Sequence, residues 1–208
     1  SNASNVKIPF TIGGTSKEAV AQSTTTATIG GTANAINFKY TVESALTGDV
    51  TLVAGALTLS SSATVRDAAT NDLTGNMSVL SGSVSVDTTS PTISSIAVIS
   101  NNNTTTLAKE GNDITFKVGF SEAVTLSNAS NVKLPFTIGG TSKEAIAQAT
   151  TTATIGGTAN AINFTYTVES ALTGVVALDG LDLQLNSATV QDAASNDLTL
   201  TMSNLTGT

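Results

Sequence analysis

The sequence contains no histidine, cysteine or tryptophan, and only eight of its 208 residues are lysine or arginine. Without His and Cys the chain lacks the commonest general base, the thiolate nucleophile and the usual zinc and iron ligands. Aromatic residues make up only 4% of the chain, so platforms that stack on sugars or bases are scarce. Together these absences favour a protein that is not an enzyme.

Positive charge is too sparse for a polyanionic partner. The net charge is −7, and no cluster of cations is present to replace the counterions of nucleic acid or to attract an anionic membrane. No apolar run approaches the roughly 20 residues of a membrane span, and no signal peptide is recognisable. We therefore expect no nucleic-acid partner, no membrane insertion and a mature internal part of a longer protein. The absence of cysteine fits an exported bacterial protein and a cytosolic one equally.

A long internal repeat is the most informative feature of the sequence. Residues 1–50 and 127–176 differ at only five positions. The match continues more loosely to Met77 and Met202, which gives a period of about 125 residues, the size of a domain. We therefore expect a piece of a longer tandem array. The five differences are Ile8/Leu134, Val20/Ile146, Ser23/Ala149, Lys39/Thr165 and Asp49/Val175.

A linker separates the two copies. Residues 87–91 read Asp-Thr-Thr-Ser-Pro between two apolar runs, and Pro91 both lacks a backbone donor and favours an extended Ser90. We place the domain boundary at about residues 86–91, with a truncated repeat over 1–86 and a nearly complete one over 87–208. Because the first copy has nothing matching 87–126, we expect it to form an incomplete sandwich whose exposed edge invites self-association.

Apolar residues alternate with polar ones along the second copy, as in half-buried strands. Gly, Asn, Ser and Asp separate the runs, as turns require. Roughly seven short strands without helical periodicity predict an all-β fold, an antiparallel β-sandwich in each copy. The clearest runs are residues 113–120 (DITFKVGF), 132–138 (VKLPFTI), 162–168 (INFTYTV), 181–185 (LDLQL) and 198–202 (LTLTM).

The sequence contains two copies of an acidic loop, ATVRDAATNDL at residues 63–73 and ATVQDAASNDL at residues 188–198. Its hard oxygens suit calcium, which takes six to eight of them from carboxylates, amides, backbone and water. The alternative is that Asp and Asn merely cap and turn the backbone. A catalytic carboxylate pair is disfavoured because stacking aromatics are lacking. The candidate calcium ligands are Asp67, Asn71, Asp72 and the junction residue Asp87 for the first loop, and Asp192, Asn196, Asp197, Asp179 and Asp182 for the second.

Five motifs in order resemble the bacterial immunoglobulin-like repeats of giant surface adhesins, the RTX-type extracellular proteins. They are FSEAVTL (120–126), LPFTIGG (134–140), INFTYTV (162–168), TVQDAASNDL (189–198) and the junction SVDTTSPTISSI (85–96). The resemblance implies tandem Greek-key Ig-like sandwiches that extend a protein outward from a bacterial cell surface. It also implies calcium at loops and junctions.

Repetition and resemblance together predict a non-catalytic spacer of an extracellular adhesin, with calcium as an added stiffener. Its partners would be the neighbouring repeats of its own chain. The alternative is a module that itself adheres or self-associates in biofilms, although the sequence specifies no receptor.

Overall fold

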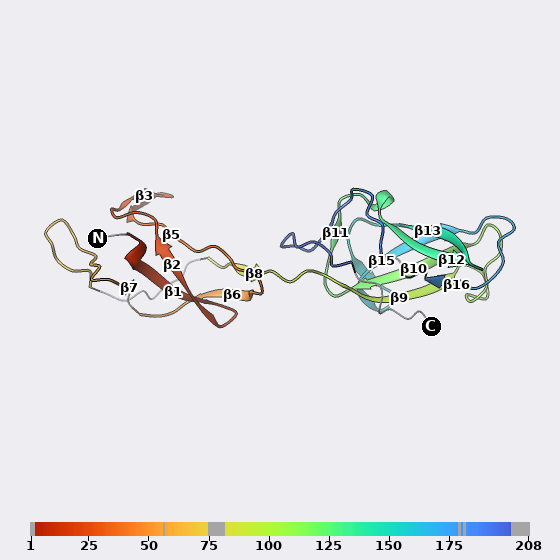
Figure 1. The fold of residues 1–208 in the computed structure, drawn as a ribbon, viewed down its shortest axis with the longest axis horizontal. Helices are drawn as coiled ribbons and strands as arrows, with labels where there is room; N and C mark the ends of the chain where they lie inside the picture. The colour runs from red at the N-terminus through yellow and green to blue at the C-terminus, as the bar shows by residue number, and fades with distance from the viewer. Residues whose placement is uncertain (1–2, 56, 75–81, 179, 181, 201–208) are drawn as a thin grey trace. The chain divides into compact units, whose positions relative to one another are not determined.

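The computed structural model describes residues 3–55, 57–74, 82–178, 180 and 182–200. The chain divides into two compact units, Ser1–Thr89 (unit 1) and Ser90–Thr208 (unit 2). Both are built from antiparallel strand ladders and carry one short 3-10 turn each, at Ala3–Asn5 and Ala129–Asn131 (Figure 1). The predicted all-β antiparallel fold is confirmed. No helix in the described parts of the chain is long and apolar enough to cross a membrane.

Unit 2 is organised around one large sheet with the strand order β16-β12-β13-β15-β10-β9. A short strand, β14, pairs with β15, and β11 and β17 form a separate two-stranded sheet. The strands are β9 (Ile93–Ser100), β10 (Asp113–Phe120), β11 (Thr125–Leu126), β12 (Lys133–Ile138), β13 (Thr141–Ala147), β14 (Ala153–Ile155), β15 (Thr158–Thr167), β16 (Val176–Leu178) and β17 (Val190–Gln191).

The core of unit 2 follows the period-two pattern. Twenty of its described residues form one buried cluster, and along β10 the side chains of Ile114, Phe116 and Val118 are all at most 3% exposed. The ring of Phe136 lies 4.7 Å from that of Phe116 and 5.3 Å from that of Tyr166, measured between centroids. Burial of each such side chain stabilises the fold by about 1.5–3 kcal/mol.

Two predicted strands of the second copy are not regular strands. Residues 182–185 and 198–200 take part only in isolated bridges, Lys133 with Gln184 and Thr92 with Thr199. A turn follows the first of these segments at once, since Asn186 and Ser187 have φ angles of +46° and +70°. That turn limits the ladder to a single bridge.

Unit 1 repeats part of this sheet, with the order β5-β2-β1-β6-β8. Since residue 1 matches residue 127, β1, β2, β3 and β6 correspond to β12, β13, β14 and β16, whereas the counterpart of β15 is broken into β4 and β5. The strands are β1 (Val6–Ile12), β2 (Thr15–Ala21), β3 (Ala27–Ile29), β4 (Thr32–Ala35), β5 (Phe38–Lys39), β6 (Thr47–Leu52), β7 (Thr58–Leu59) and β8 (Ser85–Asp87).

The core of unit 1 is smaller than that of unit 2. Its described buried residues fall into two separate clusters, one of four residues and one of three. Phe38 is only half-buried, whereas its counterpart Phe164 is fully buried. In unit 2 the strand β10 pairs with β15, and the described residues of unit 1 include no counterpart of β10. The same sequence therefore buries less apolar surface in unit 1.

Candidate functional site: the duplicated acidic loop

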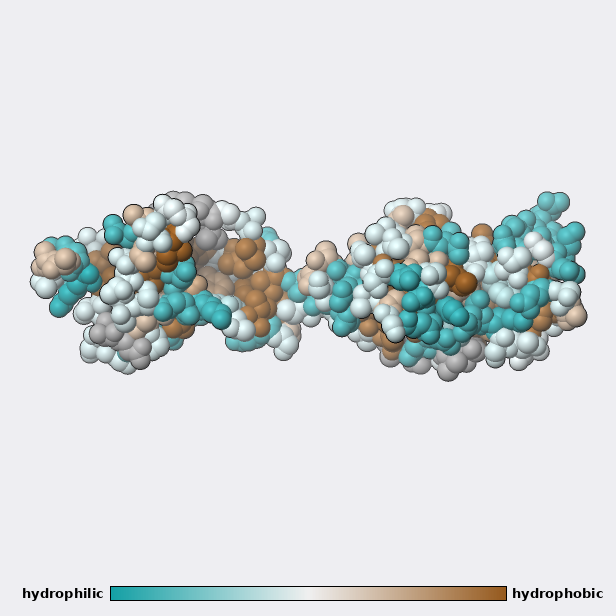
Figure 2. Space-filling view, turned by 90° about the horizontal axis from the view of Figure 1, so that it is seen from above, coloured by the Kyte–Doolittle hydropathy of each residue, from teal (hydrophilic) through white to brown (hydrophobic). Residues whose placement is uncertain are grey.

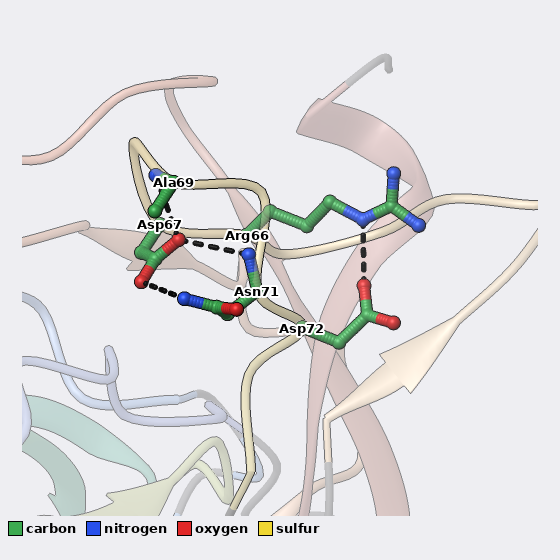
Figure 3. Close-up of polar contacts among 5 residues, drawn as sticks. All are labelled: Arg66, Asp67, Ala69, Asn71 and Asp72. Atoms are coloured by element: carbon green, nitrogen blue, oxygen red, sulfur yellow. Dashed lines mark hydrogen bonds and ion pairs between the residues drawn. The ribbon is translucent and has the colours of Figure 1, made fainter.

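The first acidic loop is closed by the carboxylate of Asp67. Its Oδ1 accepts hydrogen bonds from the backbone N–H groups of Ala69 and Asn71, both at 2.9 Å, and its Oδ2 accepts one from Asn71 Nδ2 at 2.9 Å (Figure 3). The backbone N–H of Thr70, whose φ is +68°, donates to the Asp67 carbonyl at 3.1 Å. A carboxylate used in this way builds a turn.

Asp72 faces a different partner from Asp67. Its Oδ1 lies 2.6 Å from Arg66 Nε, and the two acidic groups of the loop point to different neighbours (Figure 3). In the second loop Gln191 Nε2 donates to Asp197 Oδ1 at 2.9 Å in the same position. The two acids of each loop therefore serve separate contacts, and Arg66 places a cation beside the first loop.

The second loop repeats the hydrogen bonds of the first. Asp192 Oδ1 accepts from the backbone N–H groups of Ala194 and Asn196 at 2.8 and 2.9 Å, and Oδ2 accepts from Asn196 Nδ2 at 2.8 Å. Asp192 is only 7% exposed, whereas Asp67 is exposed. In unit 2 the strand β11 pairs with Val190 and Gln191, directly before the loop. That pairing has no counterpart in the described residues of unit 1.

Hydrogen bonding keeps both loop carboxylates ionised. The Asn71 side chain, followed by the backbone N–H groups of Asn71 and Ala69, lowers the pKa of Asp67. Burial by itself would raise the pKa of Asp192, but the hydrogen bonds from the Asn196 side chain and the loop backbone outweigh it and lower the pKa. Both carboxylates therefore stay ionised while they hold their own loops.

Two of the remaining predicted ligands, Asp87 and Asp182, are among the described residues. Asp87 ends β8 and its Oδ1 accepts a hydrogen bond from the Thr89 N–H at 2.9 Å. Asp182 is exposed, and Asp179 is outside the described residues. Among the described residues, neither Asp67 nor Asp72 belongs to a group of three acidic side chains at metal-binding spacing.

The structure adds one acidic residue that the sequence analysis missed. Carboxylate oxygens of Glu122 and Asp192 lie within 4.8 Å of each other. Glu122 comes three residues before β11, which pairs with the strand leading into the second loop. In the sequence, Glu122 is marked only by its place in the motif FSEAVTL. Its approach to Asp192 depends on the pairing of β11 with β17, two segments that lie far apart in the chain.

A lysine–glutamate pair also recurs in both units. Lys143 Nζ lies 2.8 Å from Glu169 Oε2 and 5.9 Å from the centre of the Tyr166 ring, beside a cavity of about 480 Å³. Lys17 and Glu43 repeat the pair at 2.7 Å in unit 1. The glutamate partner raises the pKa of each lysine. A lysine that acts as a general base needs a lowered pKa, so these pairs are suited to holding strands together rather than to proton transfer.

No family model, curated protein or solved structure matches the chain. The assignment of a function consequently depends on the geometry of the chain's own residues.

Proposed function

We propose that this chain is a non-catalytic structural spacer of an exported bacterial surface adhesin. The observation that carries the proposal is the equivalent use of Asp67 and Asp192, each of which accepts three hydrogen bonds from its own loop. A catalytic acid or base must present a carboxylate oxygen to the substrate. Duplicated carboxylates that hold their own turns support a role in building the fold.

The duplication itself supports a mechanical role. Residues 1–50 return almost unchanged at 127–176, and the chain divides into two compact units. Adding similar units lengthens a protein in equal steps, whereas a second copy of one catalytic site brings no new chemistry. The pKa values of the paired lysines are raised, which does not suit a general base. The lysines therefore also support a mechanical role.

Deleting or replacing both units within the adhesin tests the spacer function. Residues 1–208 would be deleted, or replaced by two unrelated β-sandwich domains of similar length, and attachment of the cells would be measured. If the units act as a spacer, we expect deletion to lower attachment and the two unrelated β-sandwich domains to restore it. If the unrelated pair is as defective as the deletion, the surface of these units is itself required and the spacer function is wrong.

A direct adhesive or self-associating module is the second candidate. Several large apolar side chains are exposed on unit 1, where Figure 2 shows brown, apolar areas. Such side chains would mark a contact site where they form one contiguous patch. Sedimentation velocity over a range of concentrations separates the two candidates, since a passive spacer sediments as a monomer throughout. The exposed residues are Val42, Val53, Leu59, Leu73 and Val84.

We propose that calcium binds at the second acidic loop (residues 188–198) and not at the first (residues 63–73). Asp72 already lies beside the Arg66 guanidinium, whereas Glu122 and Asp192 bring two carboxylates within 4.8 Å. Two like charges at that spacing disfavour each other unless a cation or a proton intervenes. Backbone, amide and water oxygens would have to supply the rest of the six to eight ligands.

Thermal unfolding in calcium and then in excess chelator tests this site. At one hundred times Kd a bound ion stabilises the folded state by about 2.7 kcal/mol. We expect calcium to raise the melting temperature of unit 2, Glu122→Gln to abolish the rise, and Asp72→Asn to leave it unchanged. A melting temperature that is equal in calcium and chelator would contradict the site.

A further inference from the structure

In unit 2 the strands β13 and β15 are paired over a short stretch only. Their register covers residues 146–147 and 164–165, whereas both strands extend beyond these pairs. A cavity of about 480 Å³ lies at the unpaired stretches of the two strands. It is lined by residues 142–144 of β13 and Tyr166 of β15, together with Pro135, Glu169 and Gln184.

The charged groups around this cavity are already paired with opposite charges. Lys143 Nζ lies 2.8 Å from Glu169 Oε2, and Lys133 Nζ lies 2.6 Å from Glu144 Oε2. A charged ligand would have to displace a lysine from its glutamate or a glutamate from its lysine. The cavity is therefore suited to a ligand without net charge.

Hydrogen-bonding capacity remains around the cavity in spite of these ion pairs. Each pair engages one carboxylate oxygen, Oε2, and an ionised carboxylate offers about four acceptor positions. Ser142 and Gln184 also line the cavity, and their side chains both donate and accept. A ligand that carries several hydroxyl groups matches this lining, because each hydroxyl also donates and accepts.

Tyr166 adds an apolar surface to the polar lining. Its ring packs edge-on against Phe136, at 5.3 Å between centroids. Its hydroxyl is buried and has no hydrogen-bond partner among the described residues, as is also the case for Tyr40 in unit 1. A tyrosine combines an apolar ring with a polar tip, which suits a ligand that has both C–H faces and hydroxyl groups.

The lysine, glutamate and tyrosine are arranged in the same way in unit 1. Lys17 Nζ lies 2.7 Å from Glu43 Oε2 and 5.9 Å from the centre of the Tyr40 ring, against 2.8 and 5.9 Å for the equivalent distances in unit 2. Among the described residues, unit 1 has no counterpart of β10 and unit 2 has none of β8. The sequence that the two units share therefore fixes this arrangement, and the elements in which they differ do not.

We propose that the cavity of unit 2 binds a neutral saccharide of about the size of a disaccharide. Pockets for small ligands have volumes of about 300–1,000 Å³, so the cavity is large enough. Glu144, Glu169 and Gln184 bind the sugar hydroxyls, and the Tyr166 ring contacts a C–H face of the sugar. This inference goes beyond the spacer function and does not depend on it.

Gln184 distinguishes the lining of unit 2 from the equivalent positions in unit 1. It lies opposite Lys133, whereas Thr58 lies opposite the equivalent Lys7 in unit 1. A glutamine amide has more hydrogen-bonding positions than a threonine hydroxyl. We therefore expect unit 2 to bind the saccharide more tightly than unit 1.

Tyrosine fluorescence observes this site selectively. The chain has no tryptophan and only two tyrosines, Tyr40 and Tyr166, so the full chain with Tyr40→Phe reports on Tyr166 alone. This variant is titrated with maltose, cellobiose, lactose and N,N′-diacetylchitobiose, and with glucuronate as a charged comparison. We expect at least one of the four neutral disaccharides to change the fluorescence saturably, and to bind more tightly than glucuronate.

Variants of the lining separate binding at this cavity from binding elsewhere. Gln184→Ala should weaken binding about tenfold, which is the effect of one lost hydrogen bond, without changing the melting of unit 2. Gln148→Ala is the matched control, because Gln148 lies outside the lining, and it should leave binding unchanged. Tyr166→Phe leaves Tyr40 as the reporter, and binding at Tyr40 should also be about tenfold weaker.

Four results would overturn the proposal. They are the absence of a saturable change with all four disaccharides, binding that Gln184→Ala leaves unchanged, equal binding at Tyr40 and Tyr166, and tighter binding of glucuronate than of every disaccharide.

Discussion

Asp192 combines a carboxylate that is 7% exposed with three hydrogen bonds from its own loop. Asp192→Ala would leave two backbone N–H groups and one amide without their acceptor, and each buried donor left unpaired costs about 1–3 kcal/mol. We expect urea unfolding to show that unit 2 loses about 3 kcal/mol of stability. Asp67→Ala is the matched control, and its loss should be clearly smaller because that loop is exposed. Equal losses would contradict the different burial of the two loops.

Stability should also depend on these carboxylates in acid. The folded pKa of Asp192 lies below its ordinary value of 3.8. The carboxylate's contribution is therefore fully present above that pH and is lost as the pH falls through the lowered pKa. Between about pH 5 and about pH 2, the unfolding free energy of the wild type should fall more steeply than that of Asp192→Asn. Parallel curves would show that the folded state does not favour the ionised form.

At the residue scale, sequence reasoning could name the acidic loop but could not decide between calcium and a turn. Asp67, Asn71 and Asp72 supply oxygens in either case. Which donors they accept from depends on the local backbone, notably the left-handed Thr70 at φ +68°. Glu122 could not be added to the site because its approach to Asp192 depends on strand pairing between distant segments.

At the element scale, the β12–β13 hairpin turns on two glycines with different surroundings. Gly139 has a φ of +55°, and a Cβ there would lie 2.2 Å from the Thr173 carbonyl oxygen. Gly140 has a φ of +82° but nothing within 4 Å of its Cβ position. Gly140→Ala should cost about 1–2 kcal/mol of strain alone.

Gly139→Ala should cost more, about 4 kcal/mol or above, because the backbone at Thr173 must also move. Thermal unfolding of the two variants measures the difference. A Gly139→Ala variant as stable as Gly140→Ala would contradict the close approach of the turn to Thr173.

Phe164 and Phe38 give a matched pair within one chain. Phe164 is fully buried, so Phe164→Ala should destabilise unit 2 by about 3–5 kcal/mol. Phe38 is half-buried, and Phe38→Ala should cost unit 1 about 1–2 kcal/mol. Urea unfolding followed separately for each unit checks both values. Similar losses would mean that unit 1 encloses its phenylalanine as well as unit 2 does.

The strands that alternate most clearly were predictable from the sequence. Residues 113–120 and 132–138 alternate over seven or eight positions and become β10 and β12. The break between β4 and β5 was not predictable from the local pattern. Residues 32–41 and 158–167 differ only at Lys39 and Thr165, yet only the second forms one continuous strand. The continuous strand pairs with β10 along its length, a contact without a counterpart in the described residues of unit 1.

At the scale of the whole molecule, the two units should unfold separately. Unit 2 has one described cluster of twenty buried residues, while the clusters of unit 1 contain four and three. Since apolar burial is the main stabilising term in folding, differential scanning calorimetry should show two transitions, with unit 1 melting first. Phe164→Ala should shift only the upper one. A single transition that shifts as a whole would show that the units fold as one.

The central claim is that residues 162–167 are paired on both sides in unit 2, whereas their near-identical counterparts 36–41 are paired only with β2 among the described strands of unit 1. Hydrogen–deuterium exchange of the intact chain tests it most directly, because residues 36–41 and 162–167 differ only at Lys39 and Thr165 and serve as controls for each other. The account predicts that the amides of 162–167, paired with β10 and β13, exchange at least about 100-fold more slowly than those of 36–41. Equal protection of the two segments would contradict it.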